Sequence, residues 1–105
     1  MQHRKPRAKR LWSTLVKFYN PIDPENHIYA AESDMPLRLH YYSDGSTRLH
    51  GEKVTSAERI PGRPDLINLL STPRRALLSV RTSISLEDYK AHQKAVRAYQ
   101  KEQKQ

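Results

Sequence analysis

The sequence predicts a small, extended α+β protein with an N-terminal amphipathic helix, one β-hairpin, short helices, a C-terminal helix and a basic N-terminal arm. Three observations carry this prediction. Apolar residues recur at helical spacing near both ends, and an alternating run around an Asp-Gly turn marks a hairpin between them. Only 36% of the 105 residues are hydrophobic and seven are proline, which limits the core. We divide the chain into a basic arm (1–7), a small irregular α+β core (8–85) and a C-terminal helix (86–105).

Positive charge is concentrated near the start of the sequence. The first acidic residue is Asp23, and six lysines or arginines precede it. Residues 11–85, by contrast, carry nine basic and eight acidic side chains. A block of like charge either stays solvated or lies against a polyanion. We therefore expect the following basic residues to bind RNA: Arg4, Lys5, Arg7, Lys9 and Arg10.

Residues 8–19 show the clearest periodicity, which predicts an amphipathic helix. Apolar residues fall three and four positions apart, at Ala8, Leu11, Trp12, Leu15, Val16 and Tyr19. The Asn-Pro pair at 20–21 would end this helix. A basic amphipathic segment is also typical of a mitochondrial targeting peptide, and a surface helix packed on its own domain is the plainest alternative. We expect Trp12, Leu15 and Val16 to dock onto neighbouring proteins or the short core.

Residues 37–50 predict a β-hairpin around the turn sequence Ser-Asp-Gly at 43–45. A two-residue loop would place Leu49 beside a histidine. A three-residue loop with a left-handed glycine would instead pair Tyr42 with Ser46. We choose the three-residue loop because register follows the hydrophobic pattern. One face then holds Leu37, Leu39, Tyr41, Thr47 and Leu49, and the other holds Arg38, His40, Tyr42, Arg48 and His50.

The polar face of this hairpin predicts an RNA surface. Arginines offer bidentate contacts to phosphates or base edges, and tyrosine and histidine rings stack on exposed bases. We expect Arg38, Tyr42 and Arg48 to contact RNA, with a solvated face as the alternative. The two histidines of this face lack cysteine or acidic partners at ligand spacing, so we expect no metal site there.

The segments that flank the hairpin are expected to be irregular. Residues 20–36 and 51–65 contain five prolines and two glycines between them. Asp65 can cap a short helix, and Thr72-Pro73 can open another short turn. The candidate core residues in this part are Leu66, Ile67, Leu69, Leu70, Leu77, Leu78 and Val80.

Residues 86–105 predict the C-terminal helix. Ser85 followed by Asp88 resembles a capping box. The helix dipole stabilises the acidic residues of the first turn. We expect the apolar residues Tyr89, Val96 and Tyr99 to dock onto neighbouring proteins or the core. A basic ridge on the helix is expected to follow an RNA backbone, with simple solvation as the alternative. This ridge consists of Lys90, Lys94, Arg97, Lys101 and Lys104, of which the first four are our candidate RNA ligands.

Several classes of protein are excluded by composition. The chain has no cysteine, which excludes disulfides, Fe–S ligation and cysteine-based zinc fingers. No apolar run reaches the roughly 20 residues of a transmembrane helix. Phosphate-binding glycine loops, nucleophile elbows and paired-histidine motifs are missing. We therefore expect no catalysis, no cofactor, no metal and no small-molecule substrate.

The overall build resembles small ribosomal proteins, mitochondrial ones especially. Ser43-Asp44-Gly45-Ser46-Thr47, followed by Ile60-Pro61-Gly62-Arg63-Pro64-Asp65, is similar to part of the forty-second family of mitochondrial large-subunit ribosomal proteins. The similar window covers about a fifth of the chain, with a shorter spacing between its two pieces than in that family. The resemblance implies a structural subunit on ribosomal RNA, without catalysis.

These observations predict a structural, rRNA-binding subunit of a ribonucleoprotein particle, in particular a mitochondrial ribosome in the matrix. Its partners would be ribosomal RNA and neighbouring ribosomal proteins, and the free monomer would not be stable. The alternative is an accessory structural subunit of a mitochondrial membrane complex, whose helix 8–19 lies on the membrane surface or on a partner. A nucleic-acid-binding factor that acts alone, and a cytoplasmic or inner-membrane location, also stay open.

Overall fold

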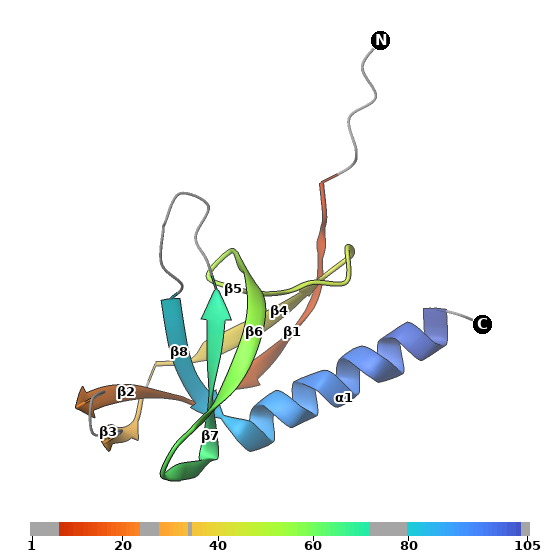
Figure 1. Ribbon diagram of the computed structural model, residues 1–105. Coiled ribbons are helices and arrows are strands. Elements are labelled where there is room, and N and C mark those ends of the chain that lie inside the picture. The colour runs from red at the N-terminus through yellow and green to blue at the C-terminus, as the bar shows by residue number, and fades with distance from the viewer. Residues whose placement is uncertain (1–6, 24–27, 34, 72–79, 104–105) are drawn as a thin grey trace.

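The computed structural model describes residues 7–23, 28–33, 35–71 and 80–103. Within these ranges the chain is mostly antiparallel β-sheet with one C-terminal helix (Figure 1). The α+β prediction with an N-terminal helix and several short helices is therefore wrong. The elements are β1 (Arg10–Val16), β2 (Phe18–Asp23), β3 (Ile28–Glu32), β4 (Leu37–Tyr42), β5 (Thr47–Leu49), β6 (Glu52–Ile60), β7 (Arg63–Ser71), β8 (Val80–Ser85) and α1 (Leu86–Gln103).

The sheet curls back on itself through its first two strands. Its strand order is β1-β4-β5-β6-β7-β8-β2-β3, and every neighbouring pair is antiparallel. Only Lys17 separates β1 from β2, yet β1 pairs with β4 while β2 pairs with β8. One bent N-terminal segment therefore joins two distant parts of the strand order. The result is a small barrel with few free strand edges.

The predicted helix over 8–19 is replaced by β1 and the start of β2. Leu11 and Leu15, which the helical spacing assigned to the buried stripe, are 41% and 57% exposed. The residues that turn inward are Trp12, Thr14 and Val16, at the two-residue spacing of a strand. This short stretch allows both periodicities, with different residues facing inward in each, and pairing with β4 and β8 decides between them.

The hairpin prediction agrees with the structure, including its loop length. The N–H of Tyr42 donates to the carbonyl of Ser46 at 2.9 Å, and Gly45 has a φ of 85°. This is the left-handed glycine of a three-residue loop. As expected, Leu37, Leu39, Tyr41 and Leu49 are buried, and Thr47 is half-buried beside them.

The segments predicted as loops and as a short helix are strands. Residues 51–65 contain β6 and the beginning of β7, joined by a turn at residues 61–62. The predicted helix over Leu66–Leu70 lies within β7, which pairs with both β6 and β8. A short apolar run fits a buried strand as well as a buried helix. Residues 20–36, also predicted as a loop, contain most of β2 and all of β3. The turn predicted at 72–73 lies outside the described residues.

The C-terminal helix begins where the capping pattern predicts. The N–H of Asp88 lies 3.4 Å from the hydroxyl of Ser85. The carboxylate of Asp88 accepts the N–H of Lys17 at 2.9 Å, and the carbonyl of Lys17 accepts the N–H of Ser85 at 2.9 Å. The first turn of α1 is thereby fastened to the bend between β1 and β2.

A single apolar cluster fills the barrel beneath α1. Its buried members come from five strands: Val16, Leu37, Leu39, Leu49, Ile67, Leu69 and Ile84. Leu86 and Tyr89 of α1 pack against it. The helix therefore covers the core instead of standing apart as a separate unit. No helix among the described residues is long and apolar enough to cross a membrane.

Candidate nucleic-acid interface

The outer side of β1, β4 and β5 gathers positive and aromatic side chains. Register places Arg10 opposite Tyr42, and His40 opposite Arg48. Arg38 is exposed on the same side of β4, and Lys53 of β6 lies opposite Arg48. We name this surface the basic outer face. It consists of Arg10, Arg38, His40, Tyr42, Arg48, His50 and Lys53.

Arg48 is held in one orientation on this face. Its guanidinium donates to Asp44 at 3.0 Å and to the hydroxyl of Ser46 at 3.2 Å, and its Cζ lies 4.1 Å from the ring centroid of Tyr42. Hydrogen bonds from Ser46, and then from Arg48, hold the pKa of Asp44 well below its ordinary value. A planar cation stacked on tyrosine is fixed before any ligand arrives. Because Arg48 covers one side of Tyr42, a base would stack on the other side of the ring or on the guanidinium itself.

His40 contributes hydrogen bonding to this face, not charge. Its Nδ1 lies 2.6 Å from the hydroxyl of Ser13 on β1. Burial lowers the pKa of His40, and the neighbouring charges of Arg10 and Arg38 lower it further. The imidazole is therefore neutral at pH 7, and it offers a flat polar ring between two arginines.

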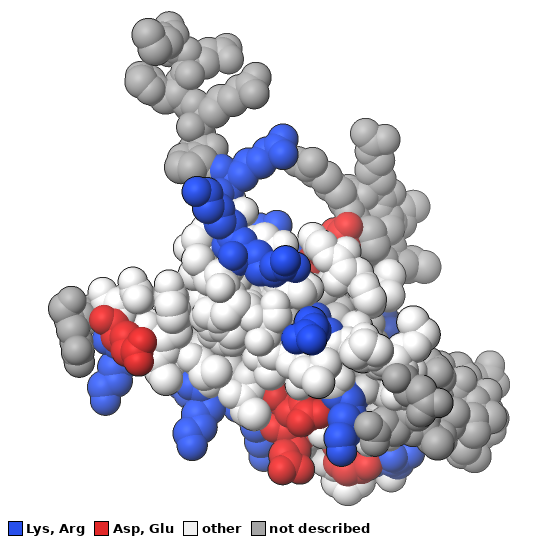
Figure 2. All heavy atoms as spheres, turned by 180° about the vertical axis from the view of Figure 1, so that it is seen from behind, with Lys and Arg blue, Asp and Glu red and all other residues white. Residues whose placement is uncertain are grey.

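The residues before β1 extend the positive surface along the hairpin turn. The N–H of Lys9 donates to the hydroxyl of Ser43 at 2.8 Å, and the N–H of Ser43 donates to the carbonyl of Lys9 at 2.8 Å. Arg7 and Lys9 are exposed. Figure 2 shows Lys and Arg side chains gathered beside the grey N-terminal segment, whereas red and blue side chains mix along the lower edge. Arg4 and Lys5 lie outside the described residues.

The basic ridge of the helix is exposed, but it lies on a different element from the outer face. Lys90, Lys94, Arg97 and Lys101 are all exposed on α1, and Glu87 and Glu102 flank them in the sequence. Lys104 is outside the described part of the chain. The helix packs its other side on β7, β1 and β8. Strand pairing thus brings the hairpin and the N-terminal cations together and leaves the helix ridge separate.

Most residues predicted to dock onto partners pack within the chain itself. Val16 is a core residue, and Tyr89 packs against the core. The ring of Trp12 lies 5.0 Å from that of Tyr41 and 6.3 Å from that of Tyr99, centroid to centroid. Val96 is half-buried beside Tyr89, and both line the same cavity. Leu15 is the member of this set that faces solvent.

Sequence reasoning missed a buried polar cluster under α1. His92 is 1% exposed, and its nitrogens lie 2.8 Å from the hydroxyl of Thr14 and 2.9 Å from that of Thr47. Burial lowers the pKa of His92, so the ring is neutral at pH 7. The one sequence signal was the position of His92 in the apolar stripe of the helix. In the part of the chain that the structure describes, no group of acidic or histidine side chains could hold a metal ion.

Comparisons with known proteins add no information about this surface. No family model, no curated protein and no solved structure matches the chain. The similarity of residues 43–65 to a ribosomal family therefore stays an expectation from the sequence. Any function must be argued from the basic outer face and its surroundings.

Proposed function

We propose that the protein is a structural, RNA-binding subunit of a ribonucleoprotein particle, and that it contacts RNA through the basic outer face. The observation that carries this proposal is the convergence of Arg10, Arg38 and Arg48 on one side of three paired strands. A sheet surface with arginines, a neutral histidine and a tyrosine suits RNA with unstacked bases, because the cations hold phosphates while the rings stack.

The overall charge supports the same function. The chain carries a formal net charge of +8, and the acidic group beside the outer face, Asp44, is bonded to Arg48 and lies 3.6 Å from Lys53. Positive charge of this kind attracts a polyanion over a distance of about one Debye length. The role that we propose is architectural.

A mitochondrial ribosome is the particle that the sequence resemblance favours. Tagged protein should then migrate with ribosomal particles from a mitochondrial lysate, and nuclease should release it. The alternative of a membrane-associated subunit depended on an amphipathic helix over 8–19. That segment forms strands, so the proposed membrane contact loses its physical basis.

Salt dependence of RNA binding tests the proposed interface. Each phosphate contact adds about 0.7 to the slope of log affinity against log salt for single-stranded RNA. We expect Arg10→Gln with Arg38→Gln to lower this slope by more than one. The matched control is Lys90→Gln with Lys94→Gln, which removes the same charge from α1. Equal effects of the two double variants, or binding that does not respond to salt, would refute the outer face as the interface.

A further inference from the structure

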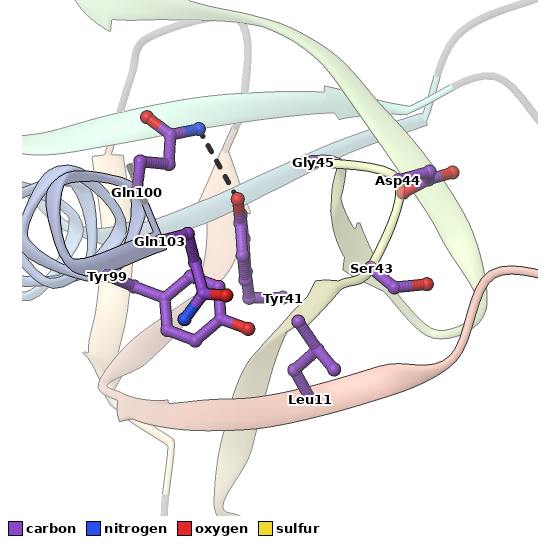
Figure 3. Close-up of a pocket in the computed structure, with 8 residues that line it drawn as sticks. All are labelled: Leu11, Tyr41, Ser43, Asp44, Gly45, Tyr99, Gln100 and Gln103. Atoms are coloured by element: carbon purple, nitrogen blue, oxygen red, sulfur yellow. Dashed lines mark hydrogen bonds between the residues drawn. The ribbon is translucent and has the colours of Figure 1, made fainter. Parts of the chain in front are cut away.

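A cavity of about 600 Å³ lies between β1, the hairpin turn and the last turns of α1 (Figure 3). Tyr99, Gln100 and Gln103 come from the helix, and Leu11 comes from the opposite strand. The remaining lining residues are Tyr41, Ser43, Asp44 and Gly45 of the hairpin. Sites for small organic groups have volumes of this order, with apolar walls and a few polar groups.

The walls of this cavity suit a flat, neutral group with polar edges. Tyr41 and Tyr99 meet edge to face with centroids 5.6 Å apart, and Trp12 supports both rings from behind. The side-chain amide of Gln100 donates to the hydroxyl of Tyr41 at 3.3 Å, so one wall is already fixed. Gln103 brings a second amide, which can both donate and accept hydrogen bonds.

Electrostatics favour a neutral group over an anion in the interior of the cavity. The glutamines belong to the C-terminal end of α1, where the helix dipole is negative. The carboxylate of Asp44 is occupied by Ser46, Arg48 and Lys53. The helix end therefore offers a phosphate no stabilisation inside the cavity, whereas a neutral ring with N–H donors on its edge is favoured. Positive charge lies just outside, since the backbone of Lys9 is bonded to Ser43 on the rim.

We propose that this cavity binds a single unstacked nucleobase of RNA, whose flanking phosphates lie on Lys9 and the basic outer face. The base packs against Tyr99 and Leu11, and the amides of Gln100 and Gln103 meet its polar edge. This inference rests on the proposed RNA-binding function and adds that the ligand is single-stranded at this point. A duplex keeps its bases stacked and cannot insert one without losing that stacking.

Two oligonucleotides of equal length distinguish the contribution of the bases to binding from that of the phosphates. One is single-stranded RNA, and the other is the same backbone with every base removed. Base stacking on an aromatic side chain contributes enough for about a tenfold difference in affinity. We expect the full-length protein to bind the base-free strand about tenfold more weakly, while both strands respond to salt.

Variants of the cavity identify which rings receive the bases. Leu11→Ser and Tyr99→Leu should weaken binding of the normal strand several-fold and leave the base-free strand unaffected. Leu15→Ser is the comparison variant, because this exposed leucine of β1 lies opposite Arg38 on the outer face and does not line the cavity. Tyr42→Leu removes the tyrosine of the outer face and measures stacking there. Emission of Trp12 reports whether Tyr99→Leu keeps the aromatic cluster folded.

The outcomes separate this inference from the proposed function. Salt-dependent binding with equal affinity for both strands would overturn the base site and leave the RNA-binding function in place. The base site would also fall if Tyr42→Leu alone removed the difference, or if Leu11→Ser behaved like Leu15→Ser. Variants that keep full RNA affinity but no longer join the particle would show that the cavity receives a protein side chain. Absence of RNA binding altogether would defeat the proposed function itself.

Discussion

His92 makes the stability of the protein depend on pH, and its surroundings give the direction. Burial lowers the pKa of His92 below its ordinary value of 6.5. Below pH 6.5 the unfolded chain therefore binds a proton at this residue that the folded chain does not. The free energy of unfolding then decreases as pH falls through 6.5 toward the lower pKa of the folded state. One proton gives a slope of up to about 1.4 kcal/mol per pH unit.

The variant His92→Gln removes the imidazole that binds this proton in the unfolded chain, and it tests the predicted pH dependence. His40 also has a lowered pKa, so the single variant should lose part of the slope, and adding His40→Gln should lose most of the rest. At pH 7 we expect His92→Gln to cost about 1–3 kcal/mol, because one amide cannot satisfy the hydroxyls of Thr14 and Thr47 as the ring does.

Urea unfolding followed by the emission of Trp12 measures both effects. Trp12 is the one tryptophan of the chain, and its ring centroid lies 5.4 Å from that of His92. Measurements between pH 5 and 8 avoid most carboxylate titration. Added to His40→Gln, the substitution His50→Gln in the exposed turn after β5 controls for the loss of an imidazole, because its charge then no longer acts on the pKa of His40. A slope in His92→Gln equal to that of the unaltered protein would refute the account.

Three further substitutions test the core, the hairpin turn and the helix start by thermal or urea unfolding. Leu39→Ala should cost about 2–5 kcal/mol because Leu39 is fully buried, whereas Leu15→Ala should change stability by less than about 0.5 kcal/mol; similar losses would contradict the core assignment. Gly45→Ala should cost about 1–2 kcal/mol, since its φ is 85° and the added methyl group meets no atom within 4 Å, so the cost is conformational only; an unchanged midpoint would argue against the left-handed turn. Asp88→Ala should cost about 1 kcal/mol by removing the acceptor for the N–H of Lys17, and full stability in this variant would show that the bond adds nothing.

Local signals were enough to predict the hairpin and the C-terminal helix. In the hairpin, the turn sequence and the alternating apolar residues agree with each other. In the helix, Ser85 and the acidic first turn mark the beginning, as the structure shows. Each of these elements is defined by residues close together in the sequence, which is the range over which pattern reasoning works.

The N-terminal strands and β7 could not be predicted for a physical reason. Trp12, Thr14 and Val16 fit a strand, while Leu11, Trp12 and Leu15 fit a helix, and the local sequence does not choose between these patterns. The strand is selected by pairing with β4 and β8, which are distant from these residues along the chain. The apolar run of β7 is ambiguous in the same way, because a buried strand and a buried helix look alike over four or five residues.

The candidate interface was predictable in part. The hairpin sequence predicts that Arg38, Tyr42 and Arg48 share one face, and register confirms that they do. The addition of Arg10 to this face depends on the pairing of β1 with β4, which the sequence did not reveal. The cavity beside Tyr99 was equally hidden, because three separate elements form it.

The bend at Lys17 has a consequence for the order in which the protein can be completed during synthesis. The backbone of Lys17 is hydrogen-bonded to Ser85 and Asp88, and Phe18 is paired with Ile84. These contacts form the seam that closes the barrel, and they join residues 17–18 to residues 84–88. A nascent polypeptide can make the hairpin early, but it cannot close the seam until residue 88 has been added. Contacts of such long range make folding slow. Lys17 and Phe18 therefore complete their contacts only after β8 and the first turn of α1 have been synthesised.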